Sequence, residues 1–181
     1  MDLLALLLLA LWVMLPAYIP NNVAVLAGGG RPIDGGREWR GKRLLGDGKT
    51  WRGTIVGSVA GVLVAVVLNT VNSAASTLLA VQFPTFAIGI VLAFPIGAML
   101  GDIVASFIKR RAGRTRGSAV PLVDQLDFVL LALIVGALVD PAWMFRVFDV
   151  ALVLVVLILT PILHIGTNIL AYVLGLKQEP W

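Results

Sequence analysis

Long apolar stretches recur along the chain and are separated by short polar segments. Five stretches stand out, at residues 3–27, 54–79, 84–108, 122–139 and 147–174. A membrane-spanning helix needs about 20 apolar residues, within a range of about 17–25. The pattern therefore predicts an all-α, polytopic membrane protein with about five transmembrane helices. The second stretch is the least regular, because Asn69, Asn72 and Ser73 interrupt its end.

Composition agrees with this pattern. The 181 residues are 59% hydrophobic and 13% charged, whereas soluble domains are about half apolar and about a quarter charged. The absence of cysteine excludes disulfide and thiolate chemistry. No repeat or low-complexity linker divides the chain, so residues 1–181 are predicted to form one domain. Asp2 precedes the first stretch where a signal peptide would carry positive charge, so this stretch is expected to be a span.

The distribution of Lys and Arg predicts the orientation. Thirteen of the fourteen basic residues fall in the loop after the first span, the loop after the third span, or the C-terminal tail; Arg146 alone falls on the other side. Basic loops stay in the cytoplasm. We therefore expect two basic cytoplasmic loops, a cytoplasmic C-terminus and an N-terminus outside the cell membrane.

The first basic loop combines glycines with cations. Gly28, Gly29 and Gly30 open it, and Lys49 and Arg52 lie near its end. Glycines let backbone N–H groups approach an anion, while Lys and Arg bind phosphate directly. Gly48-Lys49-Thr50 is similar to the end of a P-loop, but Arg43 stands where that motif needs glycine, which excludes it. A phosphate-binding loop and a plain basic loop both fit these residues.

Three carboxylates flank the second basic loop. Asp102 lies at the end of the third span, and Asp124 and Asp127 open the fourth, three residues apart on one helix face. A carboxylate at bilayer depth costs about 2.5–3.5 kcal/mol and needs a partner. Pairing with Arg110 or Arg111 would supply one, and the helix N-terminus would favour the two carboxylates of the fourth span. Alternatively, all three hold a divalent cation such as Mg²⁺ beside a phosphate site.

Further polar residues lie inside the spans. His164 and Asn168 are four residues apart in the fifth span. An interhelical hydrogen bond is the simpler interpretation, and a wall of a substrate site is the alternative. Asn21, near the inner end of the first span, could reach the same site.

These residues together resemble the archaeal CDP-archaeol synthases over nearly the whole chain. The segment from Arg43 to Gly53 is the most specific part. The other matching positions are Pro16-Ala17-Tyr18, Asn21, Gly28 to Gly30, Pro32, Asp34, Gly101-Asp102, Ser106 to Arg111, Arg116-Gly117, Pro121, Asp124 to Asp127, His164, Asn168, Ala171-Tyr172, Leu174 to Lys177 and Pro180-Trp181.

The second loop is also similar to the signature of the larger CDP-diacylglycerol synthases. Ser106 to Arg110 and the pair Asp124 and Asp127 match it. That family's Lys-Asp pair and His-Gly-Gly segment are missing, and Gln125 replaces its Arg, which favours the archaeal branch.

The resemblance implies a CTP-dependent cytidylyltransferase that needs Mg²⁺. Its substrates would be CTP and 2,3-bis-O-geranylgeranylglycerol 1-phosphate, and its products a CDP-lipid and pyrophosphate. The implied catalytic residues are Lys49, Asp102, Lys109, Asp124 and Asp127, with the three aspartates as metal ligands. The implied nucleotide- and phosphate-binding residues are Asn21, Asp34, Arg43, Asp47, Thr50, Arg52, Ser106, Arg110, Arg111 and Arg116. The expected partners are these substrates and the lipid bilayer, without nucleic acid.

Four other functions compete with this one. A CDP-diacylglycerol synthase acting on diacyl phosphatidic acid would share the chemistry. A transporter would need polar groups that reach the outer side. A CDP-alcohol phosphotransferase would need Ala where Trp51 stands, and a second pair of aspartates that the chain lacks. A scaffold that docks anionic headgroups would bind lipid without CTP.

Overall fold

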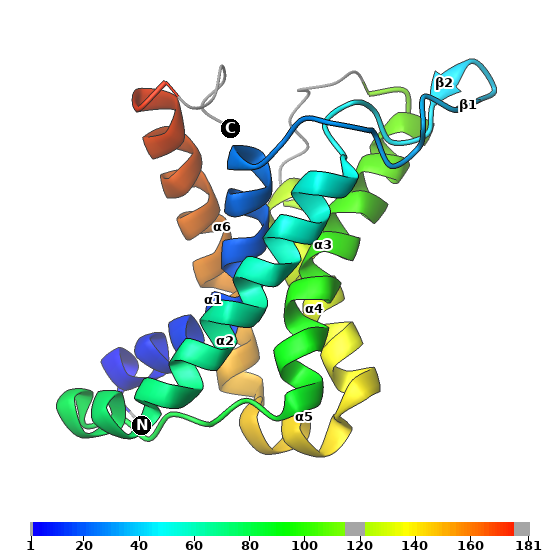
Figure 1. The fold of residues 1–181 in the computed structure, drawn as a ribbon. Coiled ribbons are helices and arrows are strands. Elements are labelled where there is room, and N and C mark those ends of the chain that lie inside the picture. Colours follow the sequence, from blue (N-terminus) through cyan, green and yellow to red (C-terminus); the bar gives the residue numbers. More distant parts are fainter. Residues whose placement is uncertain (1, 115–121, 176–181) are drawn as a thin grey trace.

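The computed structural model describes residues 2–114 and 122–175, which form a bundle of long helices (Figure 1). The helices are α1 (Leu3–Leu26), α2 (Trp51–Leu79), α3 (Ile88–Arg111), α4 (Val123–Val139), the short α5 (Pro141–Val147) and α6 (Val150–Val173). Two short antiparallel strands, β1 (Glu38–Trp39) and β2 (Lys42–Arg43), form a hairpin in the loop between α1 and α2.

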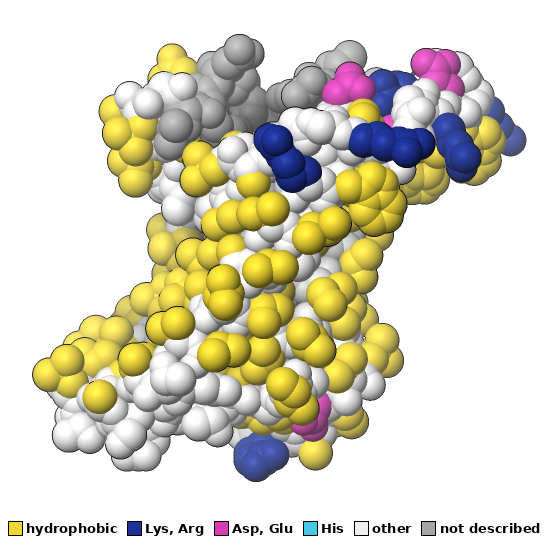
Figure 2. Space-filling model, viewed as in Figure 1, with side chains coloured by type: hydrophobic (Ala, Val, Ile, Leu, Met, Phe, Trp, Pro, Cys, Tyr) yellow, Lys and Arg dark blue, Asp and Glu magenta, His cyan; other side chains and the backbone are white. Residues whose placement is uncertain are grey.

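The predicted all-α membrane bundle is confirmed, and the described residues contain four candidate spans where about five were expected. Helices α1, α2, α3 and α6 are long and apolar enough to cross a membrane, and α4, with 17 residues, lies at the lower limit. In Figure 2 the Lys and Arg side chains gather at the end of the bundle that carries the hairpin, which we call the basic end, and the middle is largely apolar.

Local capping sets the helix boundaries. Helix α2 begins at Trp51, three residues before the predicted span, because Thr50 Oγ1 accepts a hydrogen bond from Gly53 N (3.1 Å). The fifth span was predicted to begin at residue 147, but Asp149 caps Leu152 N (2.7 Å) and α6 begins at Val150. The preceding residues form α5, which hydrophobicity alone did not predict.

Helix α3 lies at the centre of the bundle. In its most apolar window 56% of residues are buried inside the protein, compared with 17% for α6. Phe94 and Ile90 of α3 are fully buried and belong to one core cluster with Val13 of α1 and Val129 of α4. Helix α6 therefore contributes least to the core and presents most of its surface outward.

Glycines allow α1 and α2 to pack closely. A methyl group added at Gly61 would lie 2.5 Å from the Pro16 carbonyl oxygen, and one added at Gly57 would lie 2.6 Å from that of Pro20. Small residues at such spacing let membrane helices approach and gain van der Waals contact.

The polar interruption of the second span has a structural cause at the end of the bundle opposite the basic end. Residues 84–87, predicted as part of the third span, instead belong to a connection that crosses this end (Figure 1). Asn69 bonds both the N–H (2.7 Å) and the carbonyl (2.9 Å) of Phe86, and Asn72 donates to the Phe83 carbonyl (3.1 Å). The asparagines thus satisfy backbone groups that lipid could not.

Replacing Gly61 with alanine should destabilise the bundle by about 1–3 kcal/mol, because the new methyl group would overpack the α1–α2 interface. Thermal unfolding in detergent would measure this. Gly166→Ala is the matched control, since a methyl group there meets nothing within 4 Å. Equal melting temperatures for the two variants would contradict the close approach of α1 and α2.

Candidate active site

A cavity of about 380 Å³ lies between α1, α4 and α6. Its polar lining comes from Asn21 and Asn22, Lys49, three aspartates, and the side chains of Thr160, His164, Thr167 and Asn168. Its apolar lining includes Leu11, Leu15 and Ile19 of α1 and Leu163 of α6. The cavity is therefore amphipathic.

The three predicted carboxylates all line this cavity, and two of them form ion pairs. Asp102 Oδ2 lies 2.5 Å from Lys49 Nζ, and Asp124 Oδ1 lies 2.8 Å from Lys109 Nζ. Each pair joins different elements, since Lys49 comes from the first basic loop and Lys109 from the last turn of α3. Opposite charges offset the cost of burying each partner.

Asp127 differs from the other two carboxylates. Its Oδ1 accepts a hydrogen bond from Phe128 N (2.6 Å), but it forms no ion pair with a cation of residues 2–114 or 122–175. Negative charge in this part of the cavity therefore remains only partly compensated.

Glycines bring these carboxylates together. A methyl group added at Gly101 would clash with the Asp127 carbonyl oxygen, and one at Gly97 would lie 2.8 Å from Ala132 Cα. The backbones of α3 and α4 therefore touch beside Asp102 and Asp127. Ser106, one turn after Asp102 on α3, is also buried.

The fit to a divalent cation depends on the substrate. Among the described residues, no three His, Asp or Glu side chains are arranged to hold a metal ion on their own. Mg²⁺, however, usually binds through one or two carboxylates together with substrate phosphates. The oxygen donors of Asp102, Asp124 and Asp127 fit an ion that arrives with a nucleotide rather than a preformed cage.

Asn21 adds an oxygen donor at the same place. It lines the cavity and a small adjoining hollow that contains Lys49, Thr50 and Asp102. Its Oδ1 atom is buried and accepts no hydrogen bond from the described residues. A buried acceptor of this kind is costly unless a ligand or water satisfies it.

A polar stripe on α6 forms the opposite wall. Thr160, His164 and Asn168 follow one another at four-residue intervals and line the cavity. Asn168 Nδ2 lies 3.2 Å from His164 Nδ1, along the same helix. The geometry thus agrees with the alternative in which these residues wall a site. Thr160 and its partner Tyr18 (Oη to Oγ1, 2.9 Å) were not among the predicted site residues, although the four-residue spacing from Thr160 to His164 was a usable signal.

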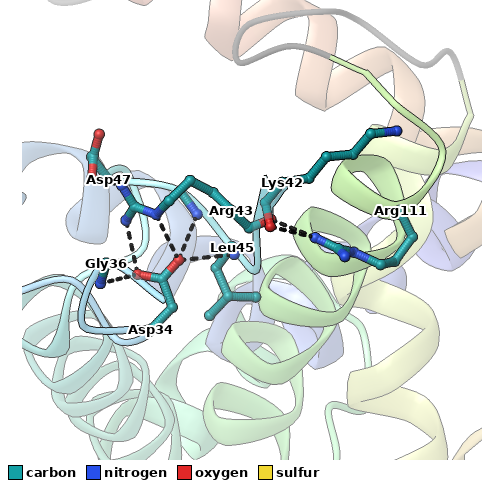
Figure 3. Close-up of polar contacts among 8 residues, drawn as sticks. Asp34, Gly36, Lys42, Arg43, Leu45, Asp47 and Arg111 are labelled. Carbon is teal, nitrogen blue, oxygen red and sulfur yellow. Dashed lines mark hydrogen bonds and ion pairs between the residues drawn. The ribbon is translucent and has the colours of Figure 1, made fainter. Parts of the chain in front are cut away.

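The first basic loop is held together by Asp34 (Figure 3). Its carboxylate accepts hydrogen bonds from Arg43 (2.9 Å), and from the backbone N–H groups of Gly36 (3.0 Å) and Leu45 (3.0 Å). Arg43 also pairs with Asp47 (2.7 Å). Close to Lys49, Ile33 N donates to the Lys49 carbonyl (2.8 Å), which joins the start of the loop to its end.

This arrangement determines the protonation of Asp34. Burial opposes ionisation, but the hydrogen bonds from Arg43 and from the backbone of Leu45, Gly46 and Gly36 outweigh it, so the pKa of the carboxyl lies well below its usual range. The hydrogen bonds that Arg43 donates to Asp34 and Asp47, with Asp34 the larger cause, raise the pKa of the Arg43 guanidinium in turn.

Two other arginines also bind backbone. Arg111, at the end of α3, donates to the carbonyl oxygens of Lys42 (3.0 Å) and Arg43 (2.7 Å) in the hairpin (Figure 3), and also to that of Trp39 (2.6 Å). Arg52 donates to the carbonyls of Ala27 (2.7 Å) and Gly28 at the end of α1. Both guanidinium groups therefore fasten the loop to the bundle.

The structure divides the predicted site residues into two groups. Lys49, Asn21 and the three aspartates line the cavity, and Lys109 reaches it through Asp124. The loop residues Asp34, Arg43 and Asp47, together with Thr50, Arg52 and Arg111, contact other protein groups, so their binding of phosphate stays a prediction. Arg110 lies partly buried in the last turn of α3. Arg116 lies outside the described residues.

Comparison with known proteins identifies the family of this chain. A model of the CarS-like CDP-archaeol synthases matches residues 3–181. The chain belongs to the CDP-archaeol synthase family. Within the family, a CDP-archaeol synthase of Halorubrum lacusprofundi is 61% identical over 172 residues, covering 95% of this chain and 96% of that protein. One of Halobacterium salinarum is 58% identical over all of both chains.

A solved structure shares the fold. The structure of an intramembrane enzyme for archaeal membrane lipid biosynthesis superposes with a TM-score of 0.71 at 36% identity, covering 90% of this chain and 94% of that one. Together with its apolar helices, this likeness makes the chain a multi-pass membrane protein.

Replacing Asp34 with asparagine should destabilise the protein by about 1–3 kcal/mol at neutral pH, because buried donors lose an ionised acceptor. The folded pKa lies below the unfolded value of about 3.9, so this stabilisation is present above that value and is lost as pH falls through the folded pKa. Thermal unfolding should thus separate wild type from variant at pH 7, and less so below about pH 4. Asp47→Asn, at an exposed carboxylate, is the control and should lower the melting temperature less. A difference in melting temperature between wild type and Asp34→Asn that does not change with pH would refute this account.

Replacing Gly101 with alanine should lower kcat by about 100-fold, because a displacement of about 1 Å at a catalytic group can cost that much. Gly89→Ala is the control on the same helix pair, since its methyl group would meet only the Val139 side chain (2.8 Å). Steady-state turnover and thermal unfolding of both variants would check this. Full activity of the Gly101 variant would show that the α3–α4 contact does not position the aspartates.

Proposed function

We propose that this protein transfers the CMP group of CTP to 2,3-bis-O-geranylgeranylglycerol 1-phosphate, releasing pyrophosphate and forming a CDP-lipid. The observation that supports it best is a single cavity that joins lysine-paired carboxylates to an apolar wall within a helix bundle. Such a cavity offers charged groups to a nucleotide and an apolar wall to a lipid. Family membership supports the same reaction.

The orientation follows from the charges. The basic end carries the loop of Lys49 and the cavity's aspartates, and basic residues remain on the cytoplasmic side. We therefore place the active site at the cytoplasmic face of the cell membrane, where CTP is made, with the N-terminus outside.

The nucleophile requires no general base. A phosphate monoester has a second pKa of about 6 and is largely ionised at neutral pH. One of its oxygens attacks the α-phosphorus of CTP, a new P–O bond forms, and the bond to the pyrophosphate oxygen breaks. The protein then has to neutralise charge and align the two substrates. Lys49 and Lys109 form ion pairs with two of the carboxylates and are suited to this role.

The carboxylates are suited to a divalent cation. Asp127 has no cationic partner among the described residues, and the buried Asn21 Oδ1 atom lacks a donor there. Asp102, Asp124 and Asp127 would hold Mg²⁺, which supplies neutralisation of the triphosphate when bound. Asn21 is placed to bind a polar group of the nucleotide.

The lipid chains would use the apolar wall. Leu11 and Leu15 of α1 lie about one to three turns farther from the basic end than Tyr18 and Asn21. Leu163 faces the same cavity from α6, which is the least buried of the four longest helices. The space between α1 and α6 is therefore the proposed path by which prenyl chains reach the phosphate site from the bilayer.

The cavity also bears on the rival functions. Its far lining is apolar at Leu11 and Leu15, whereas an ion path would need polar groups across the bundle. A diacyl phosphatidic acid would present the same phosphate, and only turnover can separate the two lipids.

The deciding experiment is turnover of labelled CTP by the purified protein with Mg²⁺ and the geranylgeranyl-ether phosphate. We expect pyrophosphate release that depends on the lipid, and a CDP-lipid product. Diacyl phosphatidic acid should be a poorer substrate. An intact protein that produces no CDP-lipid from either phosphate would refute the proposed function.

Replacing Asp127 with asparagine should reduce kcat by at least about 100-fold while melting temperature changes little, because the amide keeps the shape and removes the charge. Asp2→Asn is the control, because Asp2 caps the start of α1, far from the cavity in the sequence and outside its lining. Raising the Mg²⁺ concentration should partly restore a variant with weakened metal binding. An active Asp127→Asn enzyme would refute the assignment of Asp127 as a metal ligand.

A further inference from the structure

A second hollow lies on the opposite side of α3 from the active site. It has a volume of about 560 Å³ and is lined by Trp39, Arg40, Lys42, Phe107 and Arg111. We call it the hairpin cleft, because the hairpin overhangs the end of α3 at this point (Figure 1). No residue that lines it also lines the catalytic cavity.

The position of the cleft follows from helix periodicity. Leu100, Val104, Phe107, Ile108 and Arg111 are spaced along one face of α3. Asp102 and Lys109 lie about 180° around the helix from that face, since each residue advances about 100°. The body of α3 thus separates the cleft from the carboxylates.

The cleft carries excess positive charge. Arg40 and Lys42 are exposed and pair with no carboxylate in the described parts of the chain. The hydrogen bonds of Arg111 drawn in Figure 3 go to the backbone carbonyls of Lys42 and Arg43, which leave its charge uncompensated. Glu38 of β1 is the acidic residue of the hairpin, and it is outnumbered by these cations.

Aromatic rings form the rest of the cleft. The rings of Trp39 and Phe107 stack with centroids 6.3 Å apart, and Arg111 lies over both, at 5.3 Å and 5.6 Å. Trp39 nevertheless remains 50% exposed. Indole rings favour the boundary between lipid chains and headgroups, which is where the end of a membrane-spanning α3 places this one.

The face of α3 beyond the cleft is suited to lipid chains. Val104 and Ile108 are 42% and 54% exposed, and Leu100 continues the same apolar stripe. A ligand with a negative headgroup and long chains would contact both the cations of the cleft and the apolar stripe of α3. A free phosphate would use only the cations, and an acidic protein segment would leave the apolar stripe in contact with bilayer lipid.

From this juxtaposition we propose that the hairpin cleft binds the headgroup of an anionic phospholipid, whose chains lie along α3. This site is separate from the substrate site and holds the first basic loop against the membrane surface. It does not depend on which side of the membrane the basic end faces.

The test compares lipid binding by charge variants. Native mass spectrometry would measure binding of dioleoyl phosphatidylglycerol and of dioleoyl phosphatidylcholine to the purified full-length protein. The double variant Arg40→Glu with Lys42→Glu should bind phosphatidylglycerol at least about tenfold more weakly, with phosphatidylcholine binding unchanged. The neutral variant Arg40→Gln with Lys42→Gln should show an intermediate loss. Arg146→Glu makes the same type of change at the other end and should bind like wild type.

Two further measurements separate this site from the catalytic cavity and from misfolding. The double variant should keep its melting temperature and its turnover at saturating substrates, because neither residue belongs to the active site. Phosphatidylglycerol binding should be unchanged by Asp127→Asn, which alters only the catalytic cavity. Weaker phosphatidylglycerol binding by Asp127→Asn, or equal affinity in the double variant and Arg146→Glu, would overturn the proposal.

Discussion

The ion pair between Lys49 and Asp102 joins the first basic loop to the carboxylates of the cavity. On one side lies a loop rich in glycine and basic residues, and on the other a carboxylate at the end of an apolar helix. Neither charge is well placed alone, because a carboxylate at this depth needs a partner. Their contact at 2.5 Å fixes the loop over the cavity and thus brings a water-facing segment to a lipid-facing site. The remaining contacts of the loop support this arrangement.

Three arginines hold the loop from different directions. Arg43 gathers the loop around Asp34, Arg52 ties it to the end of α1, and Arg111 ties the hairpin to the end of α3. A guanidinium group suits this role because its planar fork donates several hydrogen bonds at once. Lysine, a point charge on a flexible stem, is used instead where the carboxylates line the cavity. The division between arginine and lysine therefore follows the geometry that each side chain offers.

Hydrophobicity predicted the spans because lipid imposes a length and a composition on each of them. It also indicated which acids would meet, since Asp102, Asp124 and Asp127 lie at span ends on one side of the membrane. The partners of the arginines could not be predicted, because a carbonyl oxygen and a phosphate oxygen attract the same guanidinium group and only the fold decides between them. The hairpin and α5 were missed because elements of 2 and 7 residues produce no periodic signal.

The uneven burial of the long helices has a consequence for exchange of a bulky lipid. The carboxylates depend on α3 and α4, whose backbones touch at Gly101, while α6 buries only 17% of its most apolar window. The wall that faces the bilayer is therefore the one whose displacement breaks the fewest internal contacts. A large apolar product can leave sideways at a modest energetic cost, and the charged frame stays assembled for the next nucleotide.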